Sequence, residues 1–123
     1  MATIEPPQDL RSRTSEFALR IIRLYTSLPK TTEAQVIGKQ VLRSGTSIGA
    51  HYREGYRAKS DADIIHKFET ALQELDETDY WLDLLVKAGI VPAQKVETLI
   101  KETNELIAIF TTIVTKIKKR RAK

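Results

Sequence analysis

The sequence predicts an all-α fold, an antiparallel up-down-up-down four-helix bundle. Apolar residues recur at helical spacing in four long segments, and no segment alternates apolar and polar residues as a strand would. Short connectors near Pro29–Thr31, Lys59–Ser60 and Gly89–Val91 separate the segments, so consecutive helices should run antiparallel. The 123 residues are enough to form one domain (1–123) with a core that needs no disulfide, and the chain has no cysteine to form one.

The first helix is expected over about residues 10–28 and the second over about 32–58. Asp9 or Ser12 is a candidate N-cap for the first helix, and Pro29 ends it. Thr32 and Gln35 form a capping-box pattern at the start of the second. The buried face of the first helix should carry Phe17, Ile21, Leu24 and Leu28.

The predicted second helix is unusual because it contains four glycines. Each glycine costs up to about 1 kcal/mol relative to alanine in a helix interior, so their presence needs a reason. Gly38, Gly45 and Gly49 favour close approach of another helix, either within the chain or in a second subunit; the alternative is a locally weak or kinked helix, which the absence of proline disfavours. Gly55 lies near the helix end.

The third helix is expected over about 61–88 and the fourth over about 92–118. Ser60 is the predicted N-cap of the third helix, Gly89 its C-terminal stop, and Pro92 stands at the start of the fourth. The inner face of the third should carry Ile65, Phe68, Leu72, Leu75, Leu82 and Leu85. In the fourth, apolar positions repeat about every 3.5 residues at Val96, Leu99, Thr103, Leu106, Phe110, Ile113 and Ile117.

Polar residues interrupt the expected facing sides of the second and third helices. We call the following set the polar seam: Arg43, Ser47, His51 and Glu54 on the second helix, and Glu74 and Glu77 on the third. We expect Arg43 or Arg57 to pair with a glutamate, with serine and histidine completing a buried network. Such a network would fix helix register and subunit geometry more than it would stabilise the fold.

The positive charge is concentrated in a predicted C-terminal tail, residues 116–123. Six of the 20 basic residues fall there, whereas the other 14 are outnumbered by 16 acidic residues. Such a run is either a solvated helix end or a binding site for nucleic-acid phosphates. The tail residues are Lys116, Lys118, Lys119, Arg120, Arg121 and Lys123.

A second candidate surface combines aromatic and basic residues. Tyr52 and Tyr56 stand one helical turn apart and are flanked by Arg53, Arg57 and Lys59. They are candidates for stacking single-stranded bases, or alternatively for a subunit contact. Four arginines of the first helix would extend the basic surface: Arg11, Arg13, Arg20 and Arg23.

The sequence gives little support for catalysis or for a bound cofactor. Carboxylate-bridged di-iron bundles use Glu-x-x-His, whereas His51 with Glu54 and His66 with Glu69 have the reverse order. No glycine-rich phosphate loop or nucleophile elbow is present. We therefore expect no catalytic residue, no metal and no cofactor. No apolar run of about 18 residues and no secretion signal is visible, so we expect a cytoplasmic protein with no membrane association.

Three segments resemble the bacterial 23S rRNA intervening-sequence proteins. They are RTSEFALRIIRLYTSLP (Arg13–Pro29), QVLRSGTSIGAHYREGYRAKSDADIIHKFETALQELDETDYWLDLL (Gln40–Leu85) and ELIAIFTTIVTKIK (Glu105–Lys118). This chain departs from the family pattern at His51, usually asparagine, and at Gly55, usually alanine. The resemblance implies a four-helix bundle related to accessory proteins of diversity-generating retroelements, which form homopentamers that work with a reverse transcriptase and nucleic acid.

Together these observations lead us to expect a non-catalytic oligomeric scaffold that binds RNA or DNA. The expected contacts are the tail cations and Arg53, Arg57 and Lys59. The alternative is a ring that binds another protein, such as a reverse transcriptase, and has no direct nucleic-acid role.

Overall fold

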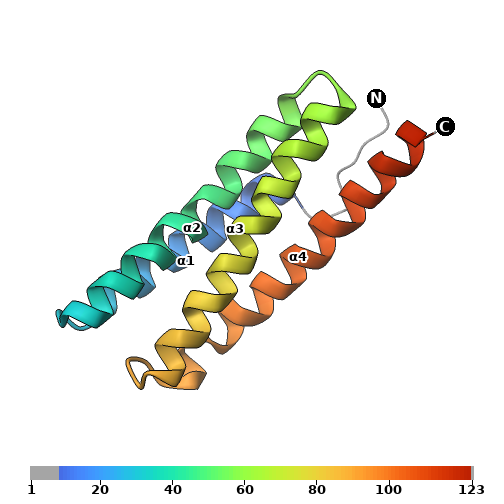
Figure 1. The fold of residues 1–123 in the computed structure, drawn as a ribbon. Coiled ribbons are helices and arrows are strands. Elements are labelled where there is room, and N and C mark those ends of the chain that lie inside the picture. The colour runs from blue at the N-terminus through green and yellow to red at the C-terminus, as the bar shows by residue number, and fades with distance from the viewer. Residues whose placement is uncertain (1–8, 123) are drawn as a thin grey trace.

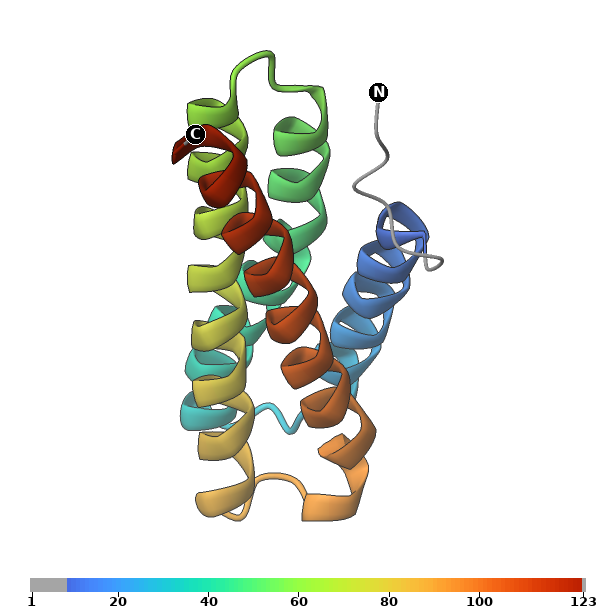
Figure 2. The same ribbon diagram turned by 90° about the vertical axis from the view of Figure 1, so that its right-hand side faces the viewer.

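A computed structural model describes residues 9–122 and confirms the all-α four-helix bundle. Its helices are α1 (Leu10–Ser27), α2 (Thr32–Arg57), α3 (Asp61–Lys87) and α4 (Ala93–Ala122), and no strand occurs among the described residues. The connections are short and the helices alternate in direction (Figure 1). Among the helix pairs that contact each other, α2 and α3 pack most extensively, and α1 and α4 least. Figure 2 shows the α1 and α4 ribbons diverging toward the start of α1 and the end of α4.

The helix boundaries follow local capping chemistry. Asp9 is the N-cap of α1 and accepts a hydrogen bond from the Arg11 amide at 3.0 Å. Thr31, and not the predicted Thr32, caps α2, since its hydroxyl accepts from the Ala34 amide. Ser60 caps α3 as predicted. α3 ends at a glycine with φ of 73°, Gly89, in the left-handed region that lacks a steric penalty only for glycine.

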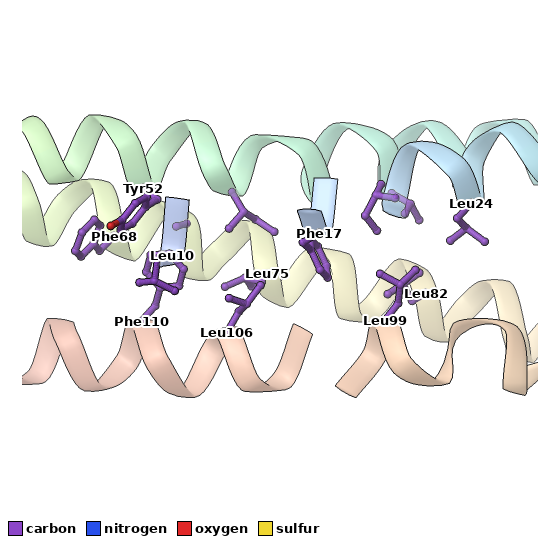
Figure 3. Close-up of a cluster of buried hydrophobic side chains, with 14 of the residues drawn as sticks. Leu10, Phe17, Leu24, Tyr52, Phe68, Leu75, Leu82, Leu99, Leu106 and Phe110 are labelled. Carbon is purple, nitrogen blue, oxygen red and sulfur yellow. The ribbon is translucent and has the colours of Figure 1, made fainter. Parts of the chain in front are cut away.

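The core is a continuous apolar cluster contributed by all four helices. The predicted core residues of the first and fourth helices are all buried, and those of the third are buried except for Leu72, which is partly covered. Figure 3 shows the core side chains of α1 and α4 meeting those of α2 and α3 along the bundle axis. The heptad-like spacing predicted α4 correctly because each turn of that helix faces the same seam.

The glycines of α2 bring it close to α1. A Cβ atom at Gly45 would lie 2.7 Å from Ile21 Cγ1, and one at Gly49 would lie 3.0 Å from Thr14 Oγ1. Close packing within the chain therefore accounts for these two residues. Gly55 instead faces Phe68 of α3.

An ion-pair cluster joins α1 to α4, which otherwise pack little against each other. Arg13 Nε donates to Glu102 at 2.6 Å, and its Nη2 donates to Glu102 at 2.8 Å and to Glu105 at 2.6 Å. The hydrogen bond to Glu102, followed by its charge, raises the pKa of Arg13. Arg13, considered above as part of the basic surface, is thus occupied by ion pairs that link α1 to α4.

α4 is longer than the sequence predicted. It continues to Ala122 and is not followed by a tail beginning at residue 116. Ile117 is buried inside this stretch, so the apolar seam continues into the basic segment. Lys123 lies outside the described residues. No helix among those described has the length and apolar character needed to cross a membrane.

Candidate nucleic-acid interface

Basic residues from three helices and one connector gather toward one end of the bundle. The alternating helix directions place the start of α1, the end of α2, the start of α3 and the end of α4 toward this end (Figures 1 and 2). The sequence did not reveal that its two candidate basic surfaces share one end. We call this region the basic end, and it comprises Arg11, Arg53, Arg57, Lys59, Lys116, Lys118, Lys119, Arg120 and Arg121.

Two of the predicted phosphate-binding residues are already paired with acidic residues of α3. Lys118 Nζ donates to Glu69 at 2.8 Å, and Arg120 Nη2 donates to Asp61 at 2.7 Å. The hydrogen bond from Arg120 lowers the pKa of the Asp61 carboxyl. Lys118 and Arg120 are therefore not free cations in this structure, and their side chains attach α4 to the start of α3.

The remaining cations of the basic end are available to a ligand. Within residues 9–122, Lys116, Lys119 and Arg121 are exposed and form no ion pair. Arg57 and Lys59 are likewise exposed. Unpaired surface cations can neutralise phosphates without first breaking an ion pair within the protein, so they are the residues best suited to that role.

A groove of about 290 Å³ lies at the basic end between the start of α1 and the end of α2. It is lined by Asp9, Arg11, Tyr52, Arg53, Tyr56 and Arg57. Arg53 is half-buried, and its Nη2 donates to Ser15 of α1 at 2.9 Å, which fixes one side of the groove. Arg11 is the one α1 arginine considered above that lines it; Arg20 instead donates to Thr98 of α4.

The two tyrosines of this groove have different environments. Tyr52 is only 3% exposed and stacks on Phe68 with ring centroids 5.8 Å apart, so it belongs to the core (Figure 3). Tyr56 stacks on Tyr52 at 5.9 Å and is 46% exposed. The expectation that both tyrosines lie at the surface is thus wrong for Tyr52.

The polar seam brings Arg43 together with the two glutamates of α3. Arg43 Nη1 lies 3.1 Å from Glu74 Oε1, and its Nη2 donates to Glu77. The hydrogen bond to Glu77 is the main cause that raises the pKa of Arg43. Arg57, the alternative partner, takes no part in the seam, because it lines the groove instead.

The other seam residues contribute less than expected to a connected network. His51 lies 3.9 Å from carboxylate oxygens of both Glu54 and Glu74, beyond hydrogen-bond distance. Its Nδ1 is buried without a hydrogen-bond partner among the described residues. Glu54 pairs with Lys67 at 3.0 Å, and that hydrogen bond lowers its pKa. Ser47 donates to the Ser44 carbonyl of its own helix.

The seam is also more solvent-exposed than the sequence suggested. The side chains of Arg43 and Glu77 are 49% and 47% exposed, so these charges flank the α2–α3 contact without lying inside it. The fully buried polar contact is between Ser44 Oγ and Thr78 Oγ1, 2.8 Å apart. Thr78 was not identified from sequence, although its position one turn after Glu74 could have indicated it.

The geometry gives no further support to a metal centre. Among residues 9–122, no group of three or more histidine, aspartate or glutamate side chains is arranged to hold a metal ion. His66 is exposed, and its backbone carbonyl accepts a hydrogen bond from the Thr70 hydroxyl.

Comparison with known proteins identifies related chains. A family model described as 23S rRNA-intervening sequence protein matches residues 8–112. A crystal structure of a Bacteroides thetaiotaomicron protein of unknown function, from the S23 ribosomal protein family, is 39% identical with a TM-score of 0.81. The alignment covers 86% of this chain and 98% of that one. A search of the curated proteins gives no match.

Proposed function

Because the chain belongs to the family of 23S rRNA-intervening sequence proteins, we propose that it is a non-catalytic oligomeric scaffold that binds RNA or DNA. The observation that carries this proposal is the set of unpaired cations gathered at the basic end. Lysine and arginine side chains bind phosphates without reading base sequence, so we expect strongly salt-dependent and weakly sequence-selective binding.

The decisive test measures binding of a fluorescent RNA and of its DNA counterpart across a salt series. A chain truncated after Thr115 would be a poor test, because it also removes the buried Ile117. A better variant combines Lys116→Gln, Lys119→Gln and Arg121→Gln, which neutralises exposed unpaired cations and leaves the core intact. Each lost phosphate contact should reduce the slope of log K against log salt by about 0.7–0.9. We therefore expect a reduction of about 2–3 if all three residues make contacts.

A matched control separates position from net charge. Lys30→Gln, Lys39→Gln and Lys95→Gln remove the same charge from exposed positions closer to the opposite end. This control should bind nearly as the parent chain does. Equal losses in both triple variants would contradict a localised interface. No binding of either nucleic acid at low salt would overturn the proposal and leave the protein-binding ring as the explanation.

The oligomeric part of the proposal is supported by apolar side chains that the isolated subunit leaves in solvent. Leu19 and Ile22 on α1 and Val36 on α2 are all exposed. Exposed apolar groups of this kind are common at subunit contacts, although single ones also occur on monomers. The family resemblance suggests a pentamer, whose mass by light scattering would be five times 14.0 kDa.

Glu77→Leu tests whether the polar seam sets the assembly. The change removes one carboxylate from Arg43 and leaves Glu74 in place. We expect a shift in the measured oligomer mass. An unchanged and equally stable assembly would restrict the seam to a role within the subunit.

A further inference from the structure

The groove between the start of α1 and the end of α2 has the chemistry of a site for one unpaired base and its neighbouring phosphates. We propose that it binds single-stranded nucleic acid, with one base stacked on Tyr56 and the adjoining phosphates contacted by Arg11, Arg53 and Arg57. This inference rests on the proposed function and narrows its ligand from nucleic acid in general to a single strand.

The stacking platform is held in place by an aromatic column that begins in the core. Phe68 is fully buried and stacks on Tyr52, with an angle of 11° between the ring planes. Tyr52 in turn stacks on Tyr56, and Phe110 meets both Phe68 and Tyr52 edge-on, with centroids 5.5 and 6.0 Å away. The column ends in a half-exposed ring, so a base would meet a pre-positioned surface and little side-chain ordering would oppose binding.

The groove also carries the charge that a phosphate backbone requires. Three arginines line it against one carboxylate, that of Asp9. The Asp9 carboxylate is engaged at the α1 N-terminus, where it accepts from the Arg11 amide and from the Ser12 hydroxyl at 2.9 Å. The Ser12 hydrogen bond lowers the pKa of Asp9, so its charge persists and offsets part of the arginine field. Positive charge remains in excess beside the aromatic ring.

The size of the groove favours a single strand over a duplex. Its volume of about 290 Å³ is at the lower end of small-ligand sites, which are about 300–1,000 Å³, so it suits one base. Bases within a duplex are stacked on their neighbours and do not offer a free face to a side chain. A duplex could contact the surrounding cations but not Tyr56.

The test compares Tyr56→Ala with Tyr56→Phe in binding a labelled RNA of about 12 nucleotides, within the usual range of single-strand site sizes. The probe has no self-complementarity, and its duplex form is measured in parallel at the same salt concentration. Loss of one base stack should weaken single-strand binding by about 5- to 150-fold in the alanine variant. The phenylalanine variant keeps the ring and should bind as the parent chain does. Duplex binding should be unchanged in both.

A second tyrosine provides the matched control. Tyr80 is 55% exposed on α3, outside the basic end, so Tyr80→Ala should leave single-strand binding unchanged. Photo-crosslinking of the parent chain to a 4-thiouridine-containing probe should label a peptide that includes Tyr56. Crosslinks confined to other helices would overturn the assignment even if a variant failed to fold.

The outcomes separate this inference from the proposed function. If Tyr56→Ala binds single strands as well as the parent does, or loses single-strand and duplex binding equally, the base site is refuted. A salt-dependent loss in the Lys116, Lys119 and Arg121 variant would then still support the scaffold. If the parent binds neither form at low salt, both proposals fail.

Discussion

The close contact between Gly45 of α2 and Ile21 of α1 predicts an unusual coupling between two mutations. A methyl group at position 45 would lie 2.7, 3.0 and 3.1 Å from Ile21 Cγ1, Cγ2 and Cδ1. Ile21 is fully buried, so it has little room to move. The added methyl group should cost about 1–3 kcal/mol through overpacking. The gain in helix propensity offsets about 1 kcal/mol of this.

Gly45→Ala alone should therefore lower the free energy of unfolding by up to about 2 kcal/mol. Ile21→Ala removes all three clashing atoms and should itself cost about 2–5 kcal/mol. In that background Gly45→Ala should stabilise the chain by about 1 kcal/mol, because the propensity gain is then unopposed. The sign of the same substitution is thus expected to reverse, with a coupling energy of about 1–3 kcal/mol.

The assay is urea unfolding of the four chains followed by helical circular dichroism. All are measured at equal protein concentration, because the stability of an oligomer depends on concentration. Gly89→Ala is the control, since it has no atom within 4 Å of its added Cβ and a φ of 73°. Its cost of about 1–2 kcal/mol should be the same with either residue at position 21. Stabilisation by Gly45→Ala in the parent chain, or additivity of the two changes, would refute the reasoning.

Three further predictions follow from polar contacts. Thr78→Val should cost about 1–3 kcal/mol, because the buried Ser44 hydroxyl then keeps only its longer hydrogen bond of 3.4 Å to the Val41 carbonyl. Adding Ser44→Ala should recover much of the loss, and equal costs for the single and double variants in urea unfolding would contradict this. Glu102→Gln should lower the free energy of unfolding by about 1–3 kcal/mol, because it removes the carboxylate that pairs with Arg13. The control Glu97→Gln, at an exposed position of the same helix, should have no such effect, and equal effects would argue against the α1–α4 cluster. Burial, and then the charges of Asp83 and Asp76, raise the pKa of the Asp79 carboxyl in the folded chain. The ionised carboxylate therefore lowers the free energy of unfolding, and this penalty disappears as the pH falls and the group is protonated. Asp79→Asn should therefore raise the urea midpoint at pH 7 but not at a pH well below the carboxyl pKa; the same gain at both values would rule out titration as the cause.

The sequence was most informative where one periodic pattern determines one face. The regular spacing of α4 identified its buried residues because a heptad repeat leaves a single orientation of the helix against its neighbours. Capping residues were identified to within one position, since several polar residues compete at each helix start. At α2 only Thr32 is followed by glutamine three residues later, yet the neighbouring Thr31 is the N-cap, because its hydroxyl accepts from the Ala34 amide.

The candidate site was less predictable because burial there depends on how the helices cross. Tyr52 and Tyr56 share a helix face by spacing, yet one belongs to the core and the other to the surface. Spacing likewise grouped Arg43 with His51, but the arginine lies at the flank of the α2–α3 contact. The sequence of a basic run also does not show whether acidic residues from other helices lie close enough to pair with it. Only the fold shows Asp61 and Glu69 beside Arg120 and Lys118.

The uneven packing of the bundle has a consequence for its local opening. α2 and α3 form a central hairpin, with α1 held against α2 and α4 against α3, while α1 and α4 have little contact with each other. Amide hydrogens in the middle of α2 and α3 should therefore exchange last, and an outer helix can open once its polar contacts with the other, such as the Arg13 ion pairs, are broken. The basic end takes residues from α1, α2 and α4, so it is complete only while both outer helices are docked. A ligand that spans it would slow amide exchange in α1 and α4 together and thereby strengthen the coupling of two helices that the fold joins mainly through polar contacts such as the Arg13 ion pairs.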